Sequence, residues 1–365
     1  MEWILLIFVI PYVFILANIF LQLKKIQPCN HSDNAGEFIS VIVPCRNAAE
    51  HLPGFIKCIR NQNYDSDLFE LIIIDDNSDD PSYIPDSEHS SLKNLKVLKN
   101  EGRGKKKAIM TGVSASAGSY IITTDADCLP GEKWLSTIAA SIQDSRPDML
   151  ICPVMLESKP GFFNIFQELE FLGLQGITAG TTVAKRPVMC NGANLVFKKE
   201  TYLVNVNNLH PEILSGDDIF LLHSLKKNHN NIIKWLESED TVMITASSAT
   251  LKDYINQRNR WISKAGAYSD RDTIILGLVT FIAVLTQIVT LLTGIFRPEL
   301  LLVFAATVLF KSFPDYLILG NTCKRYGKAQ LMKWFLPCQL IYPFYVAAVV
   351  VRSVFPGSDW NKATH

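Results

Sequence analysis

Three long stretches of the 365-residue chain are apolar and contain no charged residue. They are Trp3–Leu23 with 21 positions, Thr273–Phe296 with 24 and Trp334–Val351 with 18. An α-helix needs about 20 apolar residues to cross the hydrocarbon core of a bilayer, because each residue adds only about 1.5 Å. The pattern therefore predicts one membrane-spanning helix early in the sequence and two late in it.

A fourth apolar stretch, Leu300–Gly320, is interrupted only by Lys311 and Asp315. These two residues are four positions apart, so a helix places them on one face, where they can pair inside a bundle. We expect this stretch to span the membrane as well, which gives one N-terminal and about three C-terminal spans. A tilted or re-entrant helix with Lys311 near the membrane surface is the alternative.

Basic residues follow the first apolar stretch directly, at Lys24 and Lys25. Loops rich in Lys and Arg stay on the cytoplasmic side of a membrane, and the basic loop Cys323–Lys328 falls on that same side after two further spans. The first stretch exceeds the roughly 7–15 residues of a signal-peptide core and is preceded by Glu2, not by a basic residue. We therefore expect an uncleaved anchor and an integral membrane protein of a bacterial inner membrane, with its central segment in the cytoplasm.

The central segment has the polar and apolar alternation of a soluble domain. Strands are expected at Phe38–Pro44, Leu68–Ile74, Leu95–Leu98 and Tyr120–Thr124, and helices at Asn47–Asn61 and Lys105–Ala117. The strands are short and mostly apolar. Phe38–Pro44 is a β-branched run, as expected for a strand buried on both faces, whereas Leu95–Leu98 is a weak strand. Strands that alternate with helices form βαβ units, so we predict an α/β fold with a Rossmann-like, mostly parallel sheet.

Charge and composition narrow the class of protein. The chain has 35 basic and 35 acidic side chains, whereas binding to a nucleic-acid backbone requires an excess of Lys and Arg. Only 19% of the residues are charged and the mean hydropathy is +0.16, which fits a membrane protein and excludes a disordered or collagen-like chain. No nucleic-acid partner is expected.

Acidic side chains follow two of the expected strands. Asp75 and Asp76 end the second strand, and Asp125 and Asp127 end the fourth. The carboxyl ends of parallel strands are where open α/β sheets bind ligands. Two carboxylates one residue apart can hold a hard divalent cation that bridges phosphate oxygens. The alternative for Asp125 and Asp127 is that they form a turn and cap a helix before Trp134.

Further clusters allow two readings each. Gly102–Lys107 is glycine-rich and basic, so it can bind phosphate or be merely solvated. Asp217 and Asp218 can cap the helix that follows them or act as a base. Arginines in Gln257–Trp261 can pair with lipid phosphate or with a diphosphate leaving group. The aromatic stretch Gly161–Gln175, which contains Glu168 and Glu170, is either a core helix or a helix on the membrane surface, and we favour the surface.

In this order, the clusters resemble the motifs of a membrane-bound, inverting glycosyltransferase of the large GT-A family 2. The matching segments are Val41–Pro44 with Arg46 and Asn47, Ile74–Ser78, Gly104 and Lys105 with Ala108, the DxD motif Thr124–Asp127, the acceptor loop Asn191–Asn194, Gly216–Asp218 and the Q-x-x-R-W motif Gln257–Trp261. They extend over roughly Phe38 to Lys264. The sequence departs from the family pattern at Lys106, where glycine is common, and at Gly216–Asp218, where the family has Thr or Ser followed by Glu-Asp.

The resemblance implies a role for each of these residues. The nucleotide-sugar donor would contact Pro44, Arg46, Asn47, Asp75, Asp76, Lys105 and Asp125. Asp127, helped by Asp125, would hold Mg²⁺ or Mn²⁺. Arg260 would stabilise the leaving diphosphate, and Asp218, or alternatively Asp217, would be the catalytic base. The acceptor would contact Asn191, Gly192, Asn194, Gln257, Arg258 and Trp261.

We predict four parts: a transmembrane anchor at 1–25, a cytoplasmic glycosyltransferase domain at 26–272, transmembrane helices at 273–352 and a tail at 353–365. The expected activity is metal-dependent, inverting transfer from a nucleotide-diphosphate sugar, in the first place a UDP-sugar, to a hydroxyl of a lipid or lipid-linked acceptor. A processive polysaccharide synthase is one alternative, and with about four spans it would need a partner chain or a second copy to form a pore. A catalytically silent membrane scaffold is the other alternative.

Overall fold

The computed structural model describes residues 2–29, 36–79, 92–210, 212–213 and 215–354. The chain divides into two compact units. We call Ile26–Glu157 with Lys185–Ala246 the sheet unit, and Met1–Lys25 with Ser158–Ala184 and Ser247–His365 the membrane unit. The predicted tail at 353–365 lies outside the described residues from 355 onward. The boundaries of the four predicted parts stay predictions.

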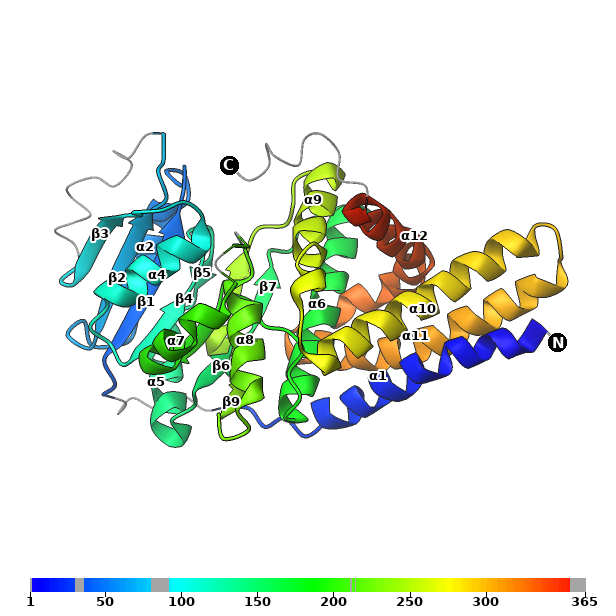
Figure 1. The fold of residues 1–365 in the computed structure, drawn as a ribbon, viewed down its shortest axis with the longest axis horizontal. Coiled ribbons are helices and arrows are strands. Elements are labelled where there is room, and N and C mark those ends of the chain that lie inside the picture. The colour runs from blue at the N-terminus through cyan, green and yellow to red at the C-terminus, as the bar shows by residue number, and fades with distance from the viewer. Residues whose placement is uncertain (1, 30–35, 80–91, 211, 214, 355–365) are drawn as a thin grey trace. The chain divides into compact units, whose positions relative to one another are not determined.

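A central seven-stranded sheet forms the core of the sheet unit, with strand order β3-β2-β1-β4-β8-β6-β9 (Figure 1). Its strands are β1 Ile39–Cys45, β2 Phe69–Asp75, β3 Leu95–Lys99, β4 Tyr120–Thr123, β6 Met149–Ile151, β8 Leu195–Lys198 and β9 Ile233–Trp235. A smaller sheet joins β5 Leu129–Pro130, β10 Met243–Thr245 and β7 Val154–Leu156. The helices of this unit are α2 Leu52–Arg60, α4 Lys105–Ala115, α5 Trp134–Ser145, α7 Lys199–Asn205 and α8 Asp217–Lys227.

The predicted parallel sheet is confirmed. β1 pairs in parallel with β2 and β4, and β2 with β3, and every residue of β1 and β2 is buried. One predicted helix is shorter than expected: the stretch Asn47–Asn61 becomes helical only at Leu52. Asn47 has a φ of +50°, which is left-handed backbone and cannot belong to the helix. Pro53 lies in the first turn of α2, where its missing N–H costs nothing because N–H groups of the first turn have no partner within the helix.

β8 is the one strand that runs against its neighbours in the central sheet of the described residues, because it pairs antiparallel with both β4 and β6. Thr123 at the end of β4 lies opposite Leu195 at the start of β8. The loop that precedes β8 therefore reaches the same edge of the sheet as the loops that follow β1, β2 and β4. This reversal brings the predicted acceptor loop to the edge that carries the acidic pairs.

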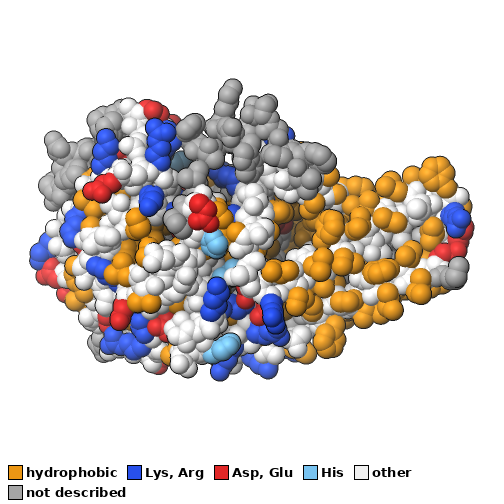
Figure 2. Space-filling view, in the orientation of Figure 1, with side chains coloured by type: hydrophobic (Ala, Val, Ile, Leu, Met, Phe, Trp, Pro, Cys, Tyr) orange, Lys and Arg blue, Asp and Glu red, His pale blue; other side chains and the backbone are white. Residues whose placement is uncertain are grey.

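The membrane unit is helical. It contains η1 Glu2–Phe8, α1 Ile10–Leu23, α6 Phe162–Val183, α9 Leu251–Ile262, α10 Arg271–Gly294, α11 Glu299–Arg325, η6 Ala329–Trp334 and α12 Phe335–Val354. Within the described residues, four helical segments are long and apolar enough to cross a membrane: Glu2–Leu23, Arg271–Gly294, Glu299–Arg325 and Ala329–Ser353. Figure 2 shows hydrophobic side chains over the outer faces of the long helices, as expected for contact with lipid.

Two glycines let α6 lie directly against α1 and α11. A Cβ on Gly180 would come within 2.8 Å of the carbonyl oxygen of Ile19, and one on Gly176 within 2.5 Å of Thr322 Oγ1. Small residues at crossings let helix backbones approach closely in membranes. The predicted pair of Lys311 and Asp315 is confirmed as a buried ion pair of 2.7 Å inside α11. The aromatic stretch with Glu168 and Glu170 lies in α6, of whose 22 residues 13 are buried, as in a core helix and not as on the surface that the sequence favoured. Glu168 and the side chain of Glu170 are buried as well.

Candidate functional site

The loop after β2 is held by the first acidic pair. Asp75 is buried, and its carboxylate accepts the N–H of Ser78 at 3.1 Å. Asp76 accepts the N–H of Gly104 at 2.8 Å and the side-chain amide of Asn100 at 2.6 Å. A carboxylate that accepts backbone N–H groups fixes the loop that bears them. Asp76 thus joins the loop after β2 to the basic segment that opens α4.

Three further residues predicted to contact the donor, Pro44, Arg46 and Asn47, lie at the end of β1 or in the loop that follows it. Asn47 donates its backbone N–H to Ser78 Oγ at 2.9 Å and exchanges side-chain and backbone hydrogen bonds of 2.9 Å with Asp79. Pro44 is the penultimate residue of β1 and lies opposite Ile74, while Arg46 is exposed in the loop that follows. The first two βα loops are therefore linked to each other by hydrogen bonds.

Lys105 occupies the centre of the edge. Its ammonium lies 2.5 Å from Asp125 Oδ1, and both side chains remain a little over one-third exposed. Burial disfavours the charge of Lys105, but the carboxylates of Asp125, Asp217 and Asp218 outweigh it and raise the pKa of Lys105. The DxD loop and the start of α8 thus act on one lysine, although about 90 residues separate them in the sequence.

The DxD loop offers oxygen ligands to a metal ion. Ligand atoms of Asp125, Asp127 and Cys128 all lie within 4.8 Å of one another, and Asp127 is exposed. Thr245 Oγ1 donates to Asp127 Oδ2 at 3.3 Å. Two carboxylates suit a hard cation such as Mg²⁺ or Mn²⁺. Burial raises the pKa of the Cys128 thiol, and its soft sulfur suits a hard cation less well than the two carboxylates.

Asp218 connects the predicted acceptor loop to α8. Its Oδ2 accepts the N–H of Gly192 at 3.0 Å, and its Oδ1 accepts the N–H of Ile219 at 2.7 Å. Asp217 is buried, whereas Asp218 is half-buried. Both carboxylates lie in the first turn of α8, where the helix dipole stabilises negative charge.

Asn191 and Asn194 hold the acceptor loop from inside. Asn191 Oδ1 accepts the N–H of Ala193 at 3.0 Å. The side chain of Asn194 is fully buried; its amide donates to the carbonyls of Pro153 and Thr241, both at 2.8 Å, and accepts from Trp134 Nε1 at 3.0 Å. This amide thus shapes the loop, in which Gly192 is also buried and Asn191 is half-buried.

Sequence reasoning missed the importance of Lys106. This side chain is 7% exposed, and its ammonium donates to the carbonyls of Leu209, His210 and Ile213 at 2.6 to 2.8 Å. It therefore anchors the segment that leads into α8. The signal in the sequence was that Lys106 stands at a position where the family commonly has glycine. The oxygen of Thr245 beside Asp127 was also missed, and no motif marks it.

The Q-x-x-R-W residues belong to α9 of the membrane unit. Arg260 is exposed, Gln257 and Trp261 are half-buried, and Arg258 is 4% exposed. Burial disfavours the charge of Arg258, but Glu170 outweighs it and raises the pKa of Arg258. The residues of the sheet edge and those of α9 thus lie on different units.

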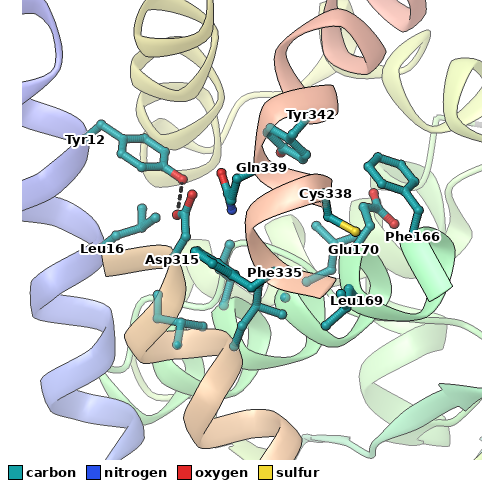
Figure 3. Close-up of a pocket in the computed structure, with 15 residues that line it drawn as sticks. Tyr12, Leu16, Phe166, Leu169, Glu170, Asp315, Phe335, Cys338, Gln339 and Tyr342 are labelled. Carbon is teal, nitrogen blue, oxygen red and sulfur yellow. Dashed lines mark hydrogen bonds between the residues drawn. The ribbon is translucent and has the colours of Figure 1, made fainter. Parts of the chain in front are cut away.

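The membrane unit also encloses a cavity of about 80 Å³ between α1, α6, α11 and α12. Figure 3 shows Tyr12 donating to Asp315 on one side, at 2.5 Å, and Glu170 on the other. Gln339 and Tyr342 of α12 face the space between them. Two carboxylates therefore line an otherwise mostly apolar cavity.

Comparisons with known proteins bear on the family and the fold. Residues 40–200 match the family described as glycosyl transferase family 2. The chain is 29% identical over 115 residues to the glycosyltransferase AglE of Haloferax volcanii, covering 31% of this chain and 38% of AglE. It is 33% identical over 132 residues to the dolichyl-phosphate beta-glucosyltransferase of Dictyostelium discoideum, covering 30% and 39%. The chain thus spans less than two-fifths of the length of these relatives.

A solved structure matches nearly the whole fold. The mannosyltransferase PcManGT from Pyrobaculum calidifontis, in complex with GDP-Man and Mn²⁺, superposes with a TM-score of 0.60 at 19% identity, covering 97% of this chain and 99% of that one. At this identity the likeness speaks for the fold. The described residues also form a mostly parallel sheet and four helices that could span a membrane. Together, these findings show that the chain has a GT-A fold and contains a glycosyl transferase family 2 domain at residues 40–200.

Proposed function

We propose that this protein transfers a sugar, with inversion, from a nucleotide-diphosphate sugar to a hydroxyl of a lipid or lipid-linked acceptor at a membrane. The observation that carries the proposal is the cluster at the sheet edge, where Lys105 lies in the field of the carboxylates of Asp125, Asp217 and Asp218. Such a cluster combines groups for a diphosphate with groups for a proton at one place.

The donor end of the proposal rests on the loops after β1, β2 and β4. Asp75 and Asp76 would bind the nucleoside, with Pro44, Arg46 and Asn47 along its edge. The accessible ion pair of Lys105 and Asp125 can exchange partners, so that the ammonium meets a phosphate oxygen. UDP-sugars are the first candidates, and GDP-sugars are the second because PcManGT was solved with GDP-Man.

Asp127 and Asp125 would hold a divalent cation, which when bound would neutralise charge on the diphosphate. The half-exposed carboxylate of Asp218 would accept the proton of the attacking hydroxyl. Attack from the face opposite the leaving nucleotide inverts the anomeric carbon. Asp217 is the less accessible of the two candidates for the base, because it is buried. Arg260 would stabilise the negative charge of the leaving group.

A membrane acceptor is supported by the four apolar helices and by the name of the Dictyostelium relative, which acts on dolichyl phosphate. The residues that we propose for contact with this acceptor are Gln257 and Trp261 of α9, and Asn191 and Gly192 of the loop before β8. The cytoplasmic side is proposed from the basic residues Lys24 and Lys25 that follow the first span.

The test uses the full chain purified in detergent, a panel of UDP- and GDP-sugars, Mg²⁺ or Mn²⁺, and a membrane lipid extract as acceptor. Release of nucleotide together with one discrete glycolipid, lost on chelation by EDTA, is the expected result. The anomeric configuration of the product, read by NMR, should be opposite to that of the donor. A long polymer would support a synthase instead, and no turnover with any donor would contradict the proposal.

A further inference from the structure

Arg258, an x position of the Q-x-x-R-W motif, is the best-anchored side chain of α9. Its guanidinium donates two hydrogen bonds to the carboxylate of Glu170 of α6, from Nη2 to Oε2 at 2.5 Å and from Nε to Oε1 at 3.1 Å. The two side chains are 5% and 8% exposed. A bidentate, buried pair of this kind fixes both the distance and the relative orientation of the helices that supply it.

The same guanidinium contacts the two motif residues that would face the acceptor. Arg258 Nη1 donates to Gln257 Oε1 at 2.6 Å. The guanidinium carbon lies 4.1 Å from the ring centroid of Trp261 and 4.6 Å from that of Tyr254. Contacts at this range between a guanidinium and an aromatic ring are favourable. Arg258 thus restrains the amide of Gln257 and the indole of Trp261 together.

Glu170 is itself fixed by a third helix. Tyr345 of α12 donates its hydroxyl to Glu170 Oε1 at 3.2 Å. Figure 3 shows Glu170 projecting from α6 towards α12, beside the cavity of the membrane unit. Three helices therefore converge on one ion pair, and the motif side of that pair is the guanidinium of Arg258.

We propose that the Glu170–Arg258 ion pair is a positioning device that sets Gln257 and Trp261 of α9 for the acceptor sugar or lipid. The proposal rests on the proposed function. A buried ion pair adds little net stability compared with apolar side chains of the same size, so stability alone does not account for this pair, whereas the geometry of the groups bonded to it does. Glu170 acts through Arg258, and Arg258 acts through Gln257 and Trp261; neither touches the reacting atoms.

The membrane unit supplies a matched control. The ion pair of Lys311 and Asp315 is equally buried but contacts Tyr12, Gln339 and Tyr342, none of which belongs to the motif. This second pair lies at a distance from α9, which it reaches through the rings of Tyr342 and Tyr345 of α12, so breaking it disturbs the helix bundle more directly than the motif. A loss of activity that follows from the bundle alone would therefore occur with both pairs.

The experiment compares R258K, E170Q, the double variant and D315N in the full-length chain in detergent. We expect R258K and E170Q each to lower kcat at least tenfold with the donor KM changed less than twofold, because misplaced contact groups slow the reaction without weakening donor binding. The double variant should be no worse than either single one, since both break the same pair. Per folded molecule, D315N should keep its kcat.

A second readout does not depend on activity. Quenching of Trp261 fluorescence by acrylamide, obtained by subtracting each variant's own W261F form, should increase in R258K and E170Q and stay unchanged in D315N. Wild-type kcat and quenching in R258K, or an equal loss of kcat in D315N and E170Q, would overturn the inference. If the wild-type chain transfers no sugar at all, the proposed function fails, and the quenching comparison alone decides whether the pair positions Trp261.

Discussion

Lys105 of the sheet unit and Lys311 of the membrane unit each pair with an aspartate, yet their surroundings differ. The Lys105–Asp125 pair measures 2.5 Å and leaves both side chains more than one-third exposed. The Lys311–Asp315 pair measures 2.7 Å with 1% and 9% exposed. A ligand can reach an accessible ion pair and replace one of its partners. It cannot reach a buried pair, which instead fixes the helix that carries it. The comparison separates charges available for chemistry from charges that hold the fold.

The largest effect should come from removing a carboxylate on the accessible side. Replacing Asp127 by Ala should lower sugar transfer by about 10³-fold or more, because loss of one electrostatic contact to a developing charge costs about 10² to 10³ and a metal ligand is lost as well. The thermal midpoint of unfolding should stay the same, since Asp127 is exposed. Nucleotide release measures the loss, and E132Q, at another exposed acid, is the control. Unchanged transfer in D127A would end the metal-site hypothesis.

On the buried side the effect should fall on stability. D315N leaves the ammonium of Lys311 without its charged partner, and breaking a buried ion pair in this way costs about 3 to 5 kcal/mol. We expect a clear drop in the melting temperature of the chain in detergent, measured by scanning fluorimetry. K105M, which breaks the accessible pair, should leave the melting temperature almost unchanged. An equal drop in both variants would remove the distinction between the two pairs.

Much of the fold and part of this distinction could be predicted from the sequence. Apolar runs located β1, β2 and β4 to within one residue, because buried strands need apolar side chains on both faces. The edge strand β3 is largely exposed, and its run was accordingly the weakest. The spacing of four between Lys311 and Asp315 predicted their pair. The sequence could not predict the direction of β8, since its pairing with β4 is set by distant residues. The anchoring by Lys106 was also missed, because a lysine buried by long-range bonds to carbonyl groups looks like any other lysine in a basic loop.

Lys106 tests whether a buried charge can also serve the chemistry. K106M keeps the aliphatic stem but loses the bonds to the carbonyls of Leu209, His210 and Ile213, so the segment before Asp217 should become less ordered. We expect about a tenfold lower kcat with an unchanged donor KM. Initial rates at saturating donor measure it, and K107M, at an exposed neighbour, should behave like the wild type. A raised donor KM with normal kcat would instead place Lys106 in donor binding.

The smallest effect concerns Glu70, a buried residue of β2 that takes part in neither the Lys105 pair nor the Lys311 pair. Burial alone would raise its pKa, but the N–H of Ala117, the ammonium of Lys96 and the hydroxyl of Ser40 outweigh burial and lower the pKa of Glu70. Because the folded-state pKa is the lower one, Glu70 stabilises the fold above its unfolded pKa of about 4.3, and the contribution is lost as the pH falls through the folded value.

E70Q should therefore cost about 1 to 3 kcal/mol at pH 7. The amide oxygen can still accept from Ser40 and Ala117, which both bond Oε1, but the amide nitrogen cannot accept from the ammonium of Lys96. In a domain of this size each kcal/mol corresponds to about 2 to 4 °C in melting temperature. The difference from the wild type should stay nearly constant down to about pH 4 and narrow below it, as the pH falls through the lowered pKa of Glu70 and the folded carboxylate becomes protonated. A difference that stayed constant below this range as well would mean that shape, and not charge, makes this buried residue stabilising.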